Sequence, residues 1–316
     1  MSNRPGPVRP PSAALLAGVA RRDITPPIGI YARNWGAARH DVAEGIHRPL
    51  TATVLAMRSG ADAPPLILAS IDATWWQGRH EEWQTRGAVL VELGLPPEAV
   101  MISCSHTHAG PSLSTDHADK PGGALIAPYL DTLRTAVIDA AREALNRLAP
   151  AVMTWATGRC DLATNRDLPD PDADRIVCGH NPTAPADDTL LVGRVTTADG
   201  AILATLVNYA CHPTTLAWEN RLISPDFVGA MREVVEAGTG GAPCLFLQGA
   251  SGELAPREQY TGDVAVADAN GRRLGYAALA TLAGMLPPAI GLGYRGVVES
   301  GAPLATWDRE PFEPPT

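Results

Sequence analysis

The sequence predicts an α/β fold, in which mixed sheets are flanked by helices and a metal site lies at the carboxyl ends of strands. Its 316 residues fit a single large domain with a well-buried core. Hydrophobic residues make up 45% of the chain and charged residues 19%, which is the balance of a globular protein. Short β-rich runs alternate with amphipathic stretches, as in a sheet packed against helices.

The first part of the chain supplies most of the predicted strands. An apolar run at residues 13–20 predicts a first strand, and the runs at 51–57, 66–71 and 100–104 predict buried strands. Residues 81–93, between the last two runs, have the spacing of a helix.

The middle of the chain contains the clearest helical pattern. Apolar residues recur on one stripe of residues 128–148, which predicts a helix that packs on a core. Residues 165–188 are dense in Asp, Pro and Asn, so we expect a long loop, and long loops in compact domains are usually functional. The runs at 190–196 and 202–209, joined at Asp199–Gly200, predict a β-hairpin.

The last part of the chain predicts two helices, at residues 226–237 and 264–286, with a buried strand at 244–248 between them. We expect residues 15–300 to form the domain. The remaining residues are Pro-rich and are expected to form flexible tails, at 1–14 and 301–316.

Composition excludes several classes of protein. A formal net charge of −9, without a basic cluster, gives no face for nucleic acid. No segment approaches the roughly 20 apolar residues of a membrane span, and no signal peptide is recognised, so we expect a cytoplasmic protein. Five cysteines without a CxxC pair argue against a disulfide framework and a thiolate zinc site. The sequence does not indicate an oligomeric state.

Two histidines follow the predicted strand at 100–104. Residues 103–111 read Ser-Cys-Ser-His-Thr-His-Ala-Gly-Pro, so a buried strand runs into a Gly-Pro turn. Side chains two residues apart in an extended segment face the same side, so His106 and His108 can converge on one point. This arrangement suits two metal ligands, or one ligand and a general base. The alternative is that both histidines hydrogen-bond the turn.

His212 ends a second hydrophobic strand in the same way, just before a proline. Because α/β sheets collect ligands at the carboxyl ends of strands, this residue and the first histidine pair are expected to share one crevice.

Asp72, which closes the run at 66–71, is a candidate ligand, a partner that orients a histidine, or a turn residue. A third strand end, at residues 246–257, leads into a Gly-rich turn that suits an oxyanion-binding loop.

These blocks, in this order and spacing, resemble the neutral/alkaline non-lysosomal ceramidase family. The catalytic domain of that family carries a Thr-His-Thr-His-Ser-Gly-Pro motif, a downstream histidine and a Gly-Asp-Val-Ser-Pro-Asn motif. The resemblance covers about residues 15–285. It extends to further short matches, at residues 23–26, 45–47, 165–166, 181–182 and 222–226.

The resemblance implies a zinc-dependent hydrolase of amide (N-acyl) bonds. By that resemblance His106 and His212 bind Zn²⁺, and His108 acts as base or acid, with Glu253 at the position of the family's aspartate. A metal-activated water would attack the amide carbonyl of a ceramide-like lipid or of another small N-acyl substrate. The residues expected to contact this substrate are Arg166, Asn165 and Gly252.

Two departures from the family pattern shape the expectation. The family's serine is Ala255 here, so a role that rests on that hydroxyl cannot operate. The family's other zinc ligands, a Glu and a Tyr, lie downstream of the Gly-Asp motif, and nothing after Leu286 resembles their surroundings. We therefore expect either a domain incomplete at its C-terminal side, or a site completed by another carboxylate, with Asp72 as the tentative third ligand.

Two other functions are compatible with the sequence. The first is a catalytically impaired homologue that binds a metal or another ligand, as the missing serine and ligands suggest. The second is a serine esterase that uses Ser251 or Ser105 with a histidine, although the chain has no GxSxG elbow.

Overall fold

Eight strands form one mixed sheet in the order β13-β11-β10-β6-β1-β3-β4-β5, in a computed structural model that describes residues 5–316. Only the pairs β4–β5 and β11–β13 are parallel, and the other neighbours are antiparallel. The strands are β1 (Ser12–Asp23), β3 (Thr51–Arg58), β4 (Leu66–Ile71), β5 (Val100–Cys104), β6 (Ala149–Arg159), β10 (Thr189–Thr197), β11 (Ile202–Tyr209) and β13 (Cys244–Gln248). The fold class expected from the sequence is confirmed.

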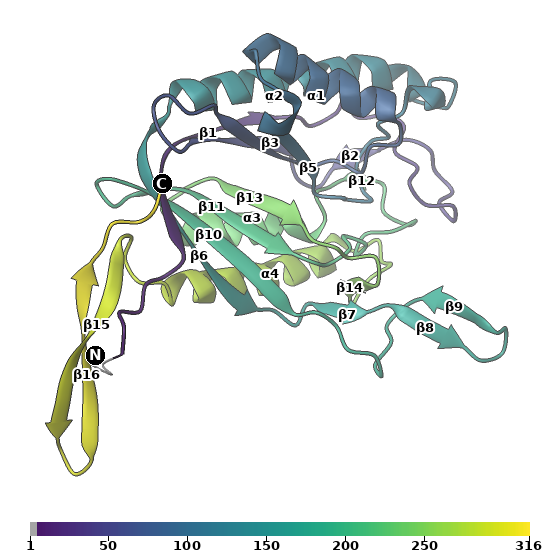
Figure 1. Ribbon diagram of the computed structural model, residues 1–316. Helices are drawn as coiled ribbons and strands as arrows, with labels where there is room; N and C mark the ends of the chain where they lie inside the picture. The colour runs from purple at the N-terminus through teal and green to yellow at the C-terminus, as the bar shows by residue number, and fades with distance from the viewer. Residues whose placement is uncertain (1–4) are drawn as a thin grey trace.

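The sheet folds over on itself, so that the protein has four layers (Figure 1). Helices α1 (Arg79–Leu93) and α2 (Ile126–Asn146) cover the half that contains β1, β3, β4 and β5. Helices α3 (Phe227–Gly238) and α4 (Val264–Ala283) cover the half that contains β6, β10, β11 and β13. A third apolar cluster, which includes Leu55 and Leu245, fills the space between the two half-sheets.

Folding over brings the two edges of the sheet together. The Ser70 hydroxyl on β4 donates a 2.7 Å hydrogen bond to the Phe246 carbonyl on β13, although these strands are far apart in the strand order. The carboxyl ends of both parallel pairs therefore meet in one place, and the loops that follow β5 and β11 lie side by side there.

Local sequence explains the main helices. In α2 the residues Leu130, Leu133, Val137 and Ala140 recur at helical spacing and are all buried. The Asp226 side chain accepts a hydrogen bond from the first backbone N–H of α3 and thereby caps its N-terminus.

The segment at 165–188, expected to be a loop, is partly paired. Strands β8 (Asp167–Asp170) and β9 (Arg175–Cys178) form a short hairpin that projects from the domain (Figure 1). The long loop expected there thus contains a paired segment that the sequence did not indicate. Each strand is only four residues long, none of these residues is buried, and their apolar residues do not alternate with polar ones, so the sequence gives no signal for pairing.

The segments expected to be tails also contain paired backbone. Strand β1 already begins at Ser12, and Val8 pairs with Leu292. Residues 1–4 lie outside the described part of the chain. The last segment forms a hairpin of β15 (Ile290–Glu299) and β16 (Pro303–Pro311).

The remaining elements are short. Strand β2 (Gly45–Ile46) pairs with β12 (Leu222–Ile223), and β7 (Ala163–Asn165) pairs with β14 (Leu254–Pro256). Within residues 5–316 no helix has the length and apolarity needed to cross a bilayer. The 3₁₀ turns are η1 (Pro97–Ala99), η2 (Thr115–His117) and η3 (Gly123–Leu125).

A buried ion pair joins the two halves. Asp72, which follows β4 and is 0% exposed, accepts hydrogen bonds of 2.7 and 2.9 Å from Arg232 on α3. It also accepts from the backbone N–H and the hydroxyl of Thr51. Both carboxylate oxygens of Asp72 thus accept hydrogen bonds.

Replacing Asp72 by Ala should lower the free energy of unfolding by about 3–5 kcal/mol, because the Arg232 charge would stay buried without its partner. Urea denaturation measures this change. As a control, Asp308→Ala removes an exposed pair with Arg295 and should cost less than about 1 kcal/mol. Equal losses in the two variants would contradict the role of the buried pair.

Candidate metal centre

His106 and His108 lie in the loop that follows β5. The Ser105 N–H donates to the Ile71 carbonyl at 2.8 Å, which continues the alignment of β4 and β5 beyond the strand. His106 then adopts φ 67°, in the left-handed region that non-glycine residues rarely occupy. The two histidine rings converge, with centroids 5.1 Å apart, but through this turn and not through the extended segment that we expected.

His212 lies in the loop that follows β11. Its backbone N–H donates to the Leu254 carbonyl at 2.8 Å, and its ring Nδ1 donates to the Ser251 carbonyl at 3.0 Å. Because a carbonyl only accepts, Nδ1 must carry the proton, and in the neutral ring Nε2 then carries a lone pair. A backbone carbonyl that fixes the tautomer in this way is typical of histidine metal ligands.

The three histidines form one cluster. One ring nitrogen from each of His106, His108 and His212 lies within 4.8 Å of the others. Nε2 of His106 and Nε2 of His212 are only 2.9 Å apart. Both ring nitrogens of His108 are buried, and neither has a hydrogen-bond partner among residues 5–316. Lone pairs that converge in this way suit a cation between the rings.

Burial keeps the three imidazoles neutral. Burial lowers the pKa of His108 to about 3, with the neighbouring His106, His212 and Arg166 adding to the effect. Burial also lowers the pKa of His212 to about 4, although its hydrogen bond to the Ser251 backbone acts in the opposite sense. The pKa of His106 is lowered too, mainly by burial. Neutral imidazole is the form that binds metals, so the lowered pKa values leave the three rings in the form that could hold a metal ion at neutral pH.

Aromatic rings surround the cluster. His108 lies between Trp35 and Trp75, with ring centroids 5.0 and 5.1 Å away. Trp35 also contacts Trp218 and Tyr260 edge-on. These rings exclude water from His108 on two sides, and they give the site an apolar wall.

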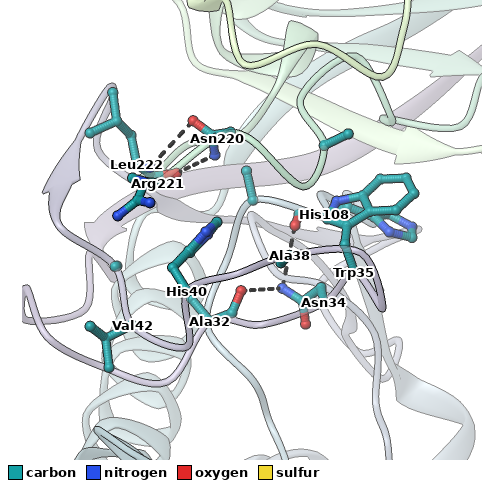
Figure 2. Close-up of a pocket in the computed structure, with 13 residues that line it drawn as sticks. Ala32, Asn34, Trp35, Ala38, His40, Val42, His108, Asn220, Arg221 and Leu222 are labelled. Atoms are coloured by element: carbon teal, nitrogen blue, oxygen red, sulfur yellow. Dashed lines mark hydrogen bonds between the residues drawn. The ribbon is translucent and has the colours of Figure 1, made fainter.

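A small cavity lies beside His108. Figure 2 shows Asn34 and Trp35 next to this histidine, and the cavity of about 10 Å³ between them has the size of one water. The Asn34 amide donates to the carbonyls of His108, at 3.3 Å, and Gly110, at 2.8 Å. Asn34 therefore supports the backbone of the first histidine loop. Neither Asn34 nor Trp35 was expected at the site, because no local pattern connects them with a strand end.

Three of the other residues expected at the site come together on one turn. The Arg166 N–H donates to the Glu253 carbonyl, and its Nε donates to the Gly252 carbonyl, both at 2.8 Å. The positive charge of Arg166 contributes to the lowered pKa of all three histidines, which places its guanidinium close to the cluster.

The remaining expected residues lie differently. The Glu253 side chain is exposed, and Asn165 accepts from the Asp167 N–H as a turn residue. Asp72 is corrected from a tentative ligand to a structural residue, because Arg232 and Thr51 occupy both of its oxygens. Within the described residues no carboxylate belongs to the histidine cluster.

Neither candidate serine has the geometry of a nucleophile paired with a histidine. The Ser251 hydroxyl accepts a hydrogen bond from Gln248, and it is the Ser251 carbonyl that faces His212. The Ser105 hydroxyl is buried without a hydrogen-bond partner in residues 5–316. Ala255 is fully buried in β14.

Comparison with known proteins supports the fold that the resemblance implied. No family model matches the chain, and no curated protein matches it in sequence. Among solved structures, a ceramidase complexed with C2 matches with a TM-score of 0.70 and 19% identity, over 90% of this chain and 47% of that one. The neutral ceramidase from Pseudomonas aeruginosa matches with a TM-score of 0.69 and 20% identity, over 90% of this chain and 48% of that one. This chain thus shares their fold and spans about half of their length.

The lowered pKa values predict how the metal-free protein responds to acid. Unfolded histidines take up protons as the pH falls through about 6.5, whereas folded His108 and His212 stay neutral down to about 3 and 4. The free energy of unfolding should therefore fall as the pH is lowered from 6.5 to 4.

Denaturant titrations with a chelator present, at several pH values, measure this slope. Replacing His108 and His212 together by Gln removes the contribution of these two rings, so the slope should become shallower. The carboxylates that titrate in the same pH range are shared by the variant and the unmodified protein, and they do not contribute to the difference. Identical slopes would show that these rings are not desolvated.

Proposed function

We propose that this chain forms the metal-binding part of a hydrolase that cleaves an amide (N-acyl) bond with a water activated at a Zn²⁺ ion. The observation that carries the proposal is the convergence of three partly buried imidazoles from His106, His108 and His212, whose pKa values are all lowered. Three protein ligands and one open position are the usual arrangement of catalytic zinc. The fold shared with ceramidases supports the amide as the bond that is cleaved.

Each residue of the site has a proposed task. Zinc bound there would lower the pKa of a coordinated water and polarise the substrate carbonyl. Arg166, held by the carbonyls of Gly252 and Glu253, would stabilise the negative charge that develops on the carbonyl oxygen. Glu253, exposed on the same turn, is our candidate to protonate the leaving amine.

The nucleophile is proposed to be water and not a serine. Ala255 replaces the serine of the family motif, and the hydroxyl of Ser251 is engaged by Gln248. A metal-activated water needs neither hydroxyl.

The substrate is proposed to be an N-acyl amide with an apolar acyl group. Trp35, Trp75 and Tyr260 line the surroundings of the cluster with ring surface, which favours apolar contact over a charged group. Ceramide-like lipids and small N-acyl amides both fit this description, so a substrate panel should contain both.

Purified protein should carry about one zinc per chain, and His106→Ala and His212→Ala should each lose it, because removing one ligand leaves a site too weak to hold the ion. Mass spectrometry of metals measures the content. A folded protein without metal after zinc reconstitution would contradict the proposal.

His108→Ala separates two roles of this residue. If His108 is a ligand, the variant loses zinc together with hydrolysis; if it is a base, as the family resemblance implies, the variant keeps zinc and loses only kcat. Glu253→Gln should keep zinc and lower kcat by about 10²–10⁴-fold.

Hydrolysis that a chelator abolishes and zinc restores would support the enzyme. The alternative, a homologue that binds metal without turnover, predicts stoichiometric zinc and no hydrolysis across the panel.

A further inference from the structure

We propose that residues 224–226 act as a clamp that fixes the distance between the two histidine loops, and that Thr107, Ser224 and Asp226 are positioning residues for the metal. The inference rests on the proposed function, because it concerns the affinity of that metal site. None of the three residues is a member of the histidine cluster, so they would act through the backbone of the loops.

One side of the clamp holds the first histidine loop. The Thr107 hydroxyl, between His106 and His108 in the chain, donates to the Ser224 carbonyl at 2.7 Å. The Ser224 N–H donates to the Ala109 carbonyl at 2.9 Å. The Thr107 hydroxyl also accepts from the Ala109 N–H, so the peptide that follows His108 is held in place.

The other side of the clamp holds the second histidine loop. The Asp226 carboxylate accepts from the Leu216 N–H at 2.9 Å, four residues beyond His212. It accepts from Thr215 as well, and from the Phe227 N–H at the start of α3. Asp226 is 0% exposed, so each of these hydrogen bonds is shielded from water.

The clamp itself is anchored to the scaffold. The His47 N–H beside β2 donates to the Ile223 carbonyl at 2.8 Å, and the His47 ring lies 2.9 Å from the Ser224 hydroxyl. The Asp226 N–H donates to that same hydroxyl at 3.0 Å. Asp226 has φ 55°, a conformation that costs of order 1–3 kcal/mol in a non-glycine residue and persists where its surroundings over-determine it.

This arrangement matters because metal–nitrogen bonds tolerate little variation in length. Zn–N bonds are about 2.0–2.1 Å, so the two loops must present their rings at a fixed separation. His106 follows the edge strand β5, and His212 follows β11, which is the neighbour of the opposite edge strand. The segment 224–226 contacts both of their loops. Partners that orient ligands in this way typically contribute 10- to 100-fold to metal affinity.

Thr107→Val tests the clamp, because it removes the hydroxyl and keeps the side-chain volume. We expect zinc affinity, measured by competition with a chromophoric chelator, to fall by about 10- to 100-fold. Thr107→Ser keeps the hydroxyl and should restore most of the affinity. Asp226→Asn, which turns one acceptor oxygen into a donor that faces a backbone N–H, should weaken zinc binding in the same range.

Two further measurements separate positioning from loss of stability. Tyr129→Phe removes a buried hydroxyl that donates to the Ile24 carbonyl at 3.0 Å in the α2 core, and it should lower the melting temperature without changing zinc affinity. The visible spectrum of the Co²⁺ protein reports ligand geometry, and it should change in Thr107→Val but not in Tyr129→Phe.

The outcomes distinguish failure of the clamp from failure of the proposed function. If the unmodified protein binds zinc and folded Thr107→Val binds it equally well, the clamp is overturned. If the unmodified protein binds no metal, the proposed function fails. The contacts of the clamp with the two histidine loops are then tested in the metal-free protein. Ring chemical shifts of His108 and His212 should then move in Thr107→Val but not in Tyr129→Phe, and unchanged shifts in both would overturn it.

Discussion

The folding-over of the eight-stranded sheet is the constraint on which the site depends. In a flat sheet the edge strands β5 and β13 would lie about 34 Å apart, since neighbouring strands are separated by about 4.8 Å. Here a hydrogen bond from Ser70 to Phe246 and the apolar cluster between the half-sheets keep the edges in contact. The carboxyl ends of both parallel strand pairs therefore open onto one place, and the histidines of two distant loops meet there.

The histidine cluster combines several features that are energetically unfavourable on their own. Three imidazoles are gathered where burial disfavours their charged forms, the ring nitrogens of His108 have no partner among residues 5–316, and His106 has left-handed backbone geometry. Such costs persist only where surrounding contacts over-determine the arrangement. The carbonyls of Ser251 and Leu254, the Asn34 amide and the Ser224 backbone supply those contacts.

Strand-end histidines and most strands could be predicted from sequence because their signals are local. Hydrophobic runs marked β3, β4, β5, β11 and β13, and the turn residues after them marked His106, His108 and His212. The role of Asp72 could not be predicted, because its partner Arg232 lies 160 residues away in the chain. The position of Trp35 and the folding-over of the sheet depend likewise on contacts between distant segments. The four-residue strands β8 and β9 contain no buried residue and no alternation of apolar and polar residues.

The four layers divide along the chain as well as in space. Strands β1, β3, β4 and β5 with α1 and α2 come from residues 12–146, and the strands and helices of the other half come from residues 149–283. Each half can condense largely through contacts within itself, and the pairing of β1 with β6 joins them. His106 belongs to the first half and His212 to the second, so the cluster exists only after the halves have docked. A nascent chain whose second half is still being synthesised therefore contains the His106–His108 pair without its third member.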